Sequence, residues 1–180
     1  DALKKSDYDP KGKFSLERFI SAHSIMISFE GVPAIYFNSL FGTSNDKSKY
    51  IITGNNRDLN RYRWNHNNIT EKLKNTKSKQ SIFYKSITDL LHIRRKQKAF
   101  HPNGLRSGIN MGPKIFCFKR QSIDKKQIII CITNLSSQIQ SKKINYKFLK
   151  WKNLLDFKNN HILDNVIKLK PFQTIWLSNV

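Results

Sequence analysis

Asparagine, arginine and aspartate crowd one short stretch of the sequence, from Thr53 to Trp64. Their side chains carry directional donors and acceptors that suit a polyhydroxylated ligand, and the arginine fork also suits a phosphate or a carboxylate. Such a segment can equally satisfy itself, through turns closed by asparagine side chains and a surface pair between Arg57 and Asp58. The composition of the stretch leaves both interpretations open.

No catalytic group can be assigned from residue type and spacing. Acid–base chemistry by carboxylates needs two of them converging on one bond, and the twelve acidic residues are scattered along the chain. A G-x-S-x-G elbow is absent from the sequence, and the five histidines lack metal-ligand spacing with cysteines or carboxylates. We therefore expect no metal, no cofactor and no complete catalytic centre in these 180 residues.

The two cysteines, Cys117 and Cys131, each lie inside an apolar, strand-like run. Free cysteine is among the most buried residue types, so we predict structural thiols in a reduced, cytoplasmic protein rather than a disulfide framework. No apolar run approaches the roughly 20 residues of a membrane span, so no membrane partner is expected.

Charge is the strongest compositional signal: 33 basic residues stand against 12 acidic ones, a net charge of +21. Such a field attracts nucleic acid or anionic substrates, which makes a basic nucleic-acid-binding module one hypothesis. However, the basic residues are spread from Lys4 to Lys170, and no zinc-finger spacing or RRM-type aromatic motif accompanies them. We therefore favour a solvated basic surface over a nucleic-acid partner.

The elements that must position the polar stretch are helices and one strand. Apolar residues at three- and four-residue steps predict helices over Phe14–Phe29 and Ser81–Lys98. Between them, the almost wholly apolar run Val32–Phe37 predicts a buried parallel strand. From Asn38 to Gln80 the periodicity disappears, which predicts a long irregular loop of the kind that usually carries function.

After His101 the sequence pattern changes to one of short strands separated by polar turns. The sequence predicts antiparallel strands over Lys114–Lys119, Gln127–Thr133, Lys143–Phe148, Asn165–Leu169 and Thr174–Leu177. The Pro102-Asn103-Gly104 turn is a plausible boundary between the two patterns. We therefore expect an α/β part over residues 1–99 and an all-β sandwich over residues 100–180.

Three segments resemble a known family in order along the chain. They are Gly31-Val-Pro-Ala-Ile-Tyr-Phe-Asn-Ser-Leu-Phe-Gly-Thr-Ser-Asn45-Asp46, Thr53-Gly-Asn-Asn-Arg57-Asp-Leu-Asn-Arg61 and Ile93-Arg-Arg-Lys-Gln-Lys-Ala-Phe-His-Pro102. Together they resemble the C-terminal portion of the sucrose phosphorylase group of the α-amylase superfamily, near the branch that includes glucosylglycerate phosphorylases. The resemblance implies that residues 1–99 are the last helix-strand-helix of a (β/α)8 TIM barrel, followed by the family's C-terminal β domain.

The resemblance also implies a reaction. Members of this family transfer an α-glucosyl unit between a glycosidic oxygen and inorganic phosphate, with retention, through a covalent glucosyl-enzyme. Their three catalytic carboxylates lie on barrel strands that precede the part matched here, so none is carried over. The expected partners are thus a sugar, phosphate and the remaining barrel segment, from the same protein or a second chain, and these residues alone should not turn over substrate.

Three residues are carried over as substrate-binding. Arg57 matches the family arginine that resembles a contact to the glucose 4-hydroxyl, and Asn45 and Asp46 match loop positions near the same mouth. Where this branch usually has Thr-Gly-Arg-Asn-Arg, the sequence reads Thr-Gly-Asn55-Asn56-Arg57, so one cation is missing and the acceptor specificity stays open. A non-catalytic carbohydrate-binding remnant is the remaining hypothesis.

Overall fold

The computed structural model describes residues 2–144, 151–156, 162–163 and 165–180. The chain forms two compact units, one made mainly by Ala34–Asp89 and the other by Leu3–Pro33 with Leu90–Val180. The predicted domains, residues 1–99 and 100–180, remain a prediction. Among the described residues, no helix is both long and apolar enough to cross a membrane.

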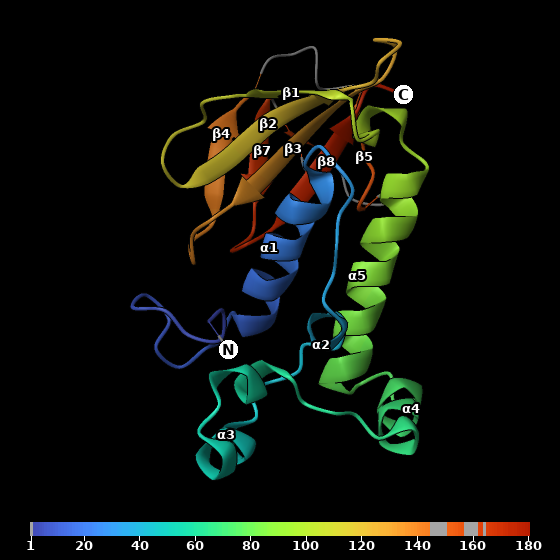
Figure 1. Cartoon of the computed structure of the whole chain (residues 1–180). Helices are drawn as coiled ribbons and strands as arrows, with labels where there is room; N and C mark the ends of the chain where they lie inside the picture. Colours follow the sequence, from blue (N-terminus) through green and yellow to red (C-terminus); the bar gives the residue numbers. More distant parts are fainter. Residues whose placement is uncertain (1, 145–150, 157–161, 164) are drawn as a thin grey trace. The chain divides into compact units, whose positions relative to one another are not determined.

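The second unit is built on two antiparallel sheets (Figure 1). The larger sheet has the order β1-β2-β3-β8-β5 and the smaller one the order β4-β7-β6. The strands of the larger sheet are β1 (Leu105–Gly108), β2 (Ile115–Gln121), β3 (Ile128–Asn134), β8 (Thr174–Ser178) and β5 (Lys152–Asn153). Those of the smaller sheet are β4 (Gln140–Lys143), β7 (Val166–Leu169) and β6 (Ile162–Leu163).

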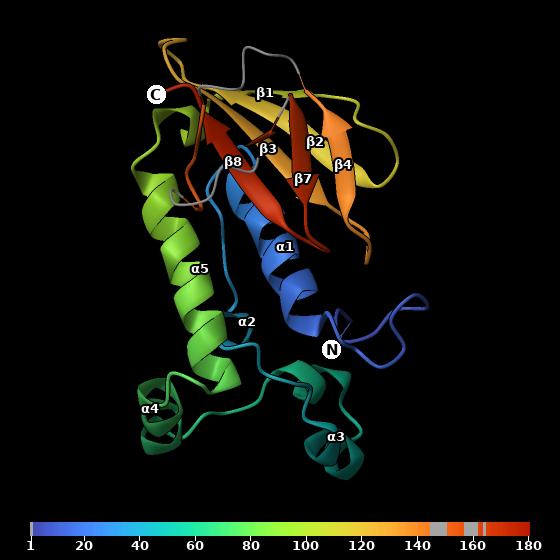
Figure 2. The ribbon, with the colours of Figure 1, turned by 180° about the vertical axis from the view of Figure 1, so that it is seen from behind.

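Alternating side chains bury an apolar core between these two sheets. The core cluster takes residues from β2, β3, β7 and β8: Ile115, Cys117, Ile130, Ile132, Ile167, Leu169, Ile175 and Leu177. Because successive residues of a strand face opposite sides, their neighbours on β2, β3 and β8 face away from this core. β4 and β7 lie behind the larger sheet in Figure 1 and in front of it in Figure 2. The antiparallel β-sandwich that the sequence predicts is thereby confirmed.

Helix α1 (Ser15–Ser28) packs against β3 and β8. It confirms the helix predicted over Phe14–Phe29, and its buried face combines the apolar Ile27, which is 0% exposed, with Arg18 and small serines. Ser21, Ser24 and Ser28 are buried while Met26 remains 36% exposed. Small side chains let a helix lie close to a sheet, and the hydroxyls of Ser24 and Ser28 are satisfied by carbonyl oxygens one turn back.

The structure corrects two sequence-based predictions between α1 and α5 (Lys79–Arg95). Val32–Phe37 is not a strand: residues 32–36 form no strand with any described residue, and the helical turn α2 (Phe37–Leu40) follows. An apolar run becomes a strand only where another strand pairs with it, and none of the described residues does so. The predicted loop over residues 38–80 instead contains α2, α3 (Lys47–Thr53), the 3₁₀ helix η1 (Asn56–Asn60) and α4 (His66–Lys74).

The remaining elements follow the sequence more closely. Helix α5 confirms the helix predicted over Ser81–Lys98, although it ends three residues earlier and Lys98 belongs to the short 3₁₀ helix η2 (Lys98–Phe100). Strands β2, β3, β7 and β8 confirm four of the predicted strands. Of the fifth, Lys143–Phe148, residues 145–150 lie outside the described part, and Lys143 ends β4. Cys117 and Cys131 are free and buried, as predicted.

Candidate functional site

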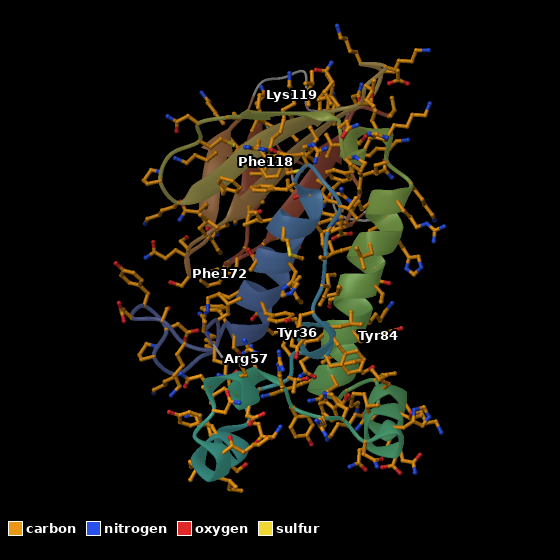
Figure 3. The ribbon with its side chains drawn as sticks, viewed as in Figure 1. Tyr36, Arg57, Tyr84, Phe118, Lys119 and Phe172 are labelled. Carbon is orange, nitrogen blue, oxygen red and sulfur yellow. The ribbon has the colours of Figure 1, made fainter. Side chains whose placement is uncertain are left out.

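Arg57 lies at the start of η1, directly after the turn that ends α3. Gly54 closes α3 in the left-handed conformation, with φ at 64°. The side chain of Asn55 then accepts a hydrogen bond from the backbone N–H of Arg57 at 3.0 Å, which caps η1. The guanidinium of Arg57 is exposed, and no described residue forms an ion pair or a hydrogen bond with it (Figure 3). The local fold thus presents this cation to solvent.

The possible surface pair between Arg57 and Asp58 is not formed. Asp58 pairs instead with Lys49 of α3, with 2.8 Å between Nζ and Oδ1. The hydrogen bond from Lys49 holds the pKa of Asp58 below its usual value. Asp58 therefore joins η1 to α3 as an ionised group and leaves Arg57 unneutralised.

Asp46 has a defined structural role. Its carboxylate caps α3 by accepting from the backbone N–H of Lys49 at 3.0 Å and from the hydroxyl of Ser48 at 2.9 Å. Its own N–H donates to the carbonyl oxygen of Leu59 in η1 at 2.7 Å. This contact brings the predicted residue Asp46 beside the segment that carries Arg57, and the exposed Asn45 precedes it.

Asn38 positions the same segment, and the sequence analysis did not single it out. It is 6% exposed, and its side-chain amide donates to the carbonyl oxygens of Asn60 at 3.1 Å and Tyr62 at 3.0 Å. The hydroxyl of Tyr36 donates to the same Asn60 oxygen at 3.2 Å. The signal that could have revealed Asn38 is a lone amide inside an apolar stretch, because a buried amide must find partners.

An aromatic cluster supports this region. The ring of Phe41 stacks on Tyr84 with centroids 5.7 Å apart and meets Trp64 edge-on at 6.4 Å. The indole N–H of Trp64 donates to the Thr43 hydroxyl at 2.9 Å. Between Phe41 and Thr43, Gly42 has φ at 58°, and a Cβ there would lie 2.1 Å from the Phe83 ring. Packed rings and directional hydrogen bonds fix the frame from which Arg57 projects.

The side chains around Arg57 offer groups that can bind a ligand. The two carboxylates nearest Arg57 in the sequence, Asp46 and Asp58, are used as a helix cap and an ion-pair partner. Across the described ranges, no group of three or more histidine, cysteine, aspartate or glutamate side chains is placed to hold a metal ion. An exposed guanidinium among asparagine side chains can grip a hydroxyl or an anion.

The most informative comparisons are with curated proteins. The chain is 31% identical over 180 residues to a glucosylglycerate phosphorylase of Escherichia coli (strain K12), covering 98% of this chain and 30% of that protein. It is also 31% identical over 119 residues to the glucosylglycerate phosphorylase of Spirochaeta thermophila, covering 66% of this chain and 20% of that protein. The chain thus spans less than a third of the length of these relatives. No family model matches it.

Solved structures give the same fold. AmyP in complex with maltose matches with a TM-score of 0.63 and 16% identity, over 90% of this chain and 34% of that one. A mutant isomaltulose synthase from Erwinia rhapontici NX5, in complex with D-glucose, matches with a TM-score of 0.65 and 13% identity, over 90% and 38%. The chain resembles the C-terminal part of the glucosylglycerate phosphorylase group of the α-amylase superfamily.

The similarity covers the C-terminal part of these relatives. The fold is that of the end of an α-amylase-type enzyme: helices and connecting segments followed by an antiparallel β domain. Arg57, Asn45 and Asp46, identified by resemblance, lie on one connected segment of the first unit. Their role toward a substrate belongs to the proposal below.

Proposed function

We propose that this chain is the C-terminal part of an α-glucoside phosphorylase that transfers a glucosyl unit to phosphate with retention. In this proposal Arg57 binds a hydroxyl of the transferred glucose. One observation supports it most: the Arg57 guanidinium is exposed and unneutralised on a segment held by Asn38 and Asp46. The 31% identity to a glucosylglycerate phosphorylase over nearly the whole chain agrees with this assignment.

The catalytic carboxylates belong, in this proposal, to the remainder of the barrel. A retaining mechanism needs two carboxyl groups about 5 Å apart, one as nucleophile and one as acid and base. Asp46 and Asp58 both hold local structure instead, so neither is free for this work. The remaining barrel segment comes from the same protein or from a second chain, and the present residues alone do not turn over substrate. We place the reaction in the cytoplasm.

The test requires the missing barrel segment. The chain is coexpressed with, or joined to, the barrel of the Escherichia coli relative, and phosphate-dependent release of glucose 1-phosphate is assayed from glucosylglycerate and from sucrose. We expect Arg57→Ala to lower kcat/KM about 30- to 150-fold, since a hydrogen bond from a charged group is worth about 2–3 kcal/mol. Arg63→Ala is the matched control on the same exposed stretch. An unchanged kcat/KM in Arg57→Ala would contradict the proposal.

Two variants of Asp46 are needed, because the same carboxylate caps α3 and is proposed to contact the substrate. Asp46→Asn keeps an oxygen that can cap α3, whereas Asp46→Ala removes it. A substrate contact predicts that Asp46→Asn loses activity while it keeps the unfolding midpoint. If Asp46→Asn is fully active and only Asp46→Ala is impaired, Asp46 is a helix cap alone. Asn45→Ala is assayed in parallel.

The net charge of +21 supports a second candidate, a basic nucleic-acid-binding module. This candidate predicts duplex or single-strand binding whose logarithm falls steeply with the logarithm of salt concentration. A third candidate, a non-catalytic carbohydrate-binding remnant, predicts weak glucose binding by the chain alone that Arg57→Ala abolishes. Calorimetry with glucose, phosphate and an oligonucleotide separates the three.

A further inference from the structure

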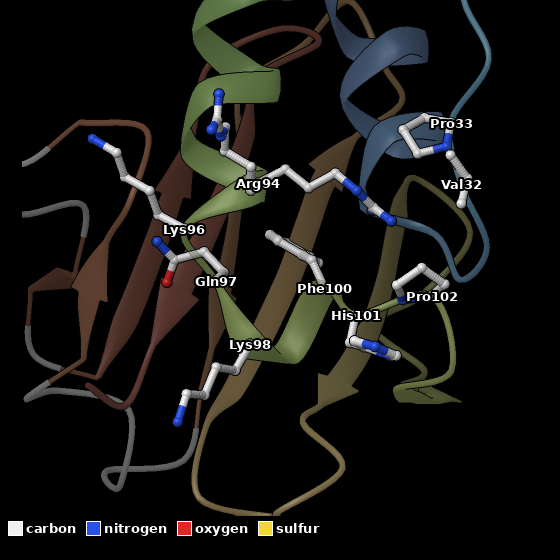
Figure 4. A pocket seen from close by; sticks show the side chains of 10 residues that line it. Val32, Pro33, Arg94, Lys96, Gln97, Lys98, Phe100, His101 and Pro102 are labelled. Atoms are coloured by element: carbon white, nitrogen blue, oxygen red, sulfur yellow. The ribbon is translucent and has the colours of Figure 1, made fainter.

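A pocket of about 360 Å³ lies in the second unit, where α5 ends and η2 begins. Its lining residues come from two segments of the chain. One supplies Val32 and Pro33, and the other runs from Arg94 to Pro102 and supplies every residue except Ala99. Phe100, 2% exposed, lies in the middle of this set in Figure 4. Pockets of this size hold small organic molecules.

The charge of the pocket has one sign. Four of its lining residues are Arg94, Arg95, Lys96 and Lys98, and no acidic residue lines it. Two acids lie close by: the carboxylate of Asp124 is 3.6 Å from the amine of Lys98, and Glu30, two residues before Val32, is paired with Arg106 at 2.6 Å. The pair between Asp124 and Lys98 is weak, because the Lys98 side chain is 79% exposed. The pocket therefore has a positive potential that its own residues do not cancel.

The side chain of Arg94 is held in place and forms part of the pocket surface. Its guanidinium donates to the carbonyl oxygens of Ile27, of Phe29 at 3.0 Å and of Gly31 at 2.7 Å. Figure 4 shows it extending across to the loop that carries Val32 and Pro33. Carbonyl partners satisfy its N–H groups but leave its unit charge in place. Burial, with the neighbouring Arg120, lowers the pKa of the Arg94 guanidinium.

The other side chains divide into donors and apolar surfaces. Lys96 and Lys98 extend outward in Figure 4, and their flexible stems allow the amines to follow an anion. The Nδ1 atom of His101 accepts from the N–H of Asn103 at 3.1 Å, which leaves Nε2 as a donor. Pro33, Pro102 and Phe100 offer apolar surface.

We propose that this basic pocket binds a phosphate monoester. The phosphate would be bound by the exposed side chains of Arg95, Lys96 and Lys98, whose flexible stems would fold toward it. Three cations beside the single carboxylate of Asp124 favour a dianion over a carboxylate. The organic part would cover Phe100 and the prolines. The site is formed within the second unit alone, so it does not depend on the proposed role of Arg57.

Calorimetry on the full 180-residue chain tests the proposal, with phenyl phosphate, glucose 1-phosphate and inorganic phosphate as probes. We expect saturable binding of the two esters in the millimolar range or tighter, and weaker binding of inorganic phosphate, which lacks the organic part. The double variant Lys96→Gln with Lys98→Gln should weaken ester binding about tenfold. The control pair, Lys143→Gln with Lys168→Gln, removes the same charge from exposed positions of β4 and β7 and should leave binding within twofold.

Three outcomes would overturn the proposal that the basic pocket binds a phosphate monoester. The first is the absence of saturable binding. The second is an equal loss of ester binding in the control pair, which would indicate an effect of the general positive field. The third is a loss of ester binding in Arg57→Ala but not in the pocket variant. Because all four substituted lysines are partly or fully exposed, the unfolding midpoints should stay unchanged. The proposed function fails separately, in the turnover assay with Arg57→Ala.

Discussion

The side-chain amide of Asn38 lies 3.1 Å from the carbonyl oxygen of Asn60, which joins α2 to the end of η1 across 22 residues of sequence. A second bond, to Tyr62, uses the other amide hydrogen. Both protons of one buried amide thus hold the segment that presents Arg57. Asn38 is buried where it binds this segment, and Arg57 is exposed on the same segment.

Asn38→Ala should therefore lower the free energy of unfolding by about 1–3 kcal/mol, because two hydrogen bonds from a buried amide are lost, although the Asn60 oxygen keeps the Tyr36 hydroxyl as a donor. Urea unfolding followed by Trp fluorescence measures this change. Asn103→Ala, at an exposed turn, is the control and should remain within about 0.5 kcal/mol. Equal midpoints for the two variants would show that Asn38 does not hold the segment.

Gly42 and Gly54 form a matched pair for backbone strain. Both have positive φ, 58° and 64°, but a Cβ at Gly42 meets the Phe83 ring whereas Gly54 has nothing within 4 Å. Gly54→Ala should cost about 1 kcal/mol from the left-handed conformation alone. Gly42→Ala should cost about 2–4 kcal/mol, because displacement of the ring adds to that strain. Thermal unfolding ranks the two, and equal losses would contradict the packing argument.

Arg120 is fully buried and carries no carboxylate partner among the described residues. Its guanidinium donates to the carbonyl oxygens of Ser28 and His101, both at 2.8 Å. Arg120→Met should lower the free energy of unfolding by about 3 kcal/mol, since these acceptors lose a charged donor. Arg63→Met, on an exposed stretch, should change it by less than about 0.5 kcal/mol. A stable Arg120→Met protein would show that these hydrogen bonds do not outweigh the cost of burying the charge.

The carboxylate of Asp9 should make the stability of the folded protein depend on pH. The hydrogen bond from the Phe14 N–H, with those from Arg18 and Lys13, lowers the pKa of Asp9 to about 2. A lowered folded-state pKa gives stability that is complete above the unfolded value, about 3.9, and lost as the pH falls through about 2. The difference in melting temperature between the wild type and Asp9→Asn should thus be present at pH 5 and shrink toward pH 2.

Asp89→Asn is the control for this experiment, because its exposed pair with Lys85 on α5 contributes little. Its melting temperature should follow that of the wild type across the same pH range. A constant difference between wild type and Asp9→Asn down to pH 2 would contradict the assignment to this carboxylate.

Periodicity predicted the elements whose partners lie within the chain. Helices α1 and α5 and strands β2, β3, β7 and β8 were found from local pattern, because burial on one or both faces leaves a clear period. Val32–Phe37 carried the same kind of signal and was wrong, since pairing depends on a neighbouring strand that local sequence cannot supply. Helices α3 and α4 were missed although Asp46 and Asn65 are standard caps, because their short apolar faces give little periodicity.

The candidate site was predictable only in part. Arg57 followed from resemblance, and its exposure agrees with a binding role that remains to be tested. The roles of Asn38 and Arg120 depend on carbonyl oxygens far away in sequence, Asn60 and Ser28, which no local pattern reveals. The basic pocket likewise combines residues about 60 positions apart.

Strand β3 has strands on both edges and side chains buried on both faces: Ile130 and Ile132 face the smaller sheet, while Ile129 and Cys131 face the opposite side. Its backbone amides can meet deuterium only when the whole second unit opens. In heavy water they should be the last protons to disappear from the spectrum, and their rate gives the global opening free energy of that unit directly.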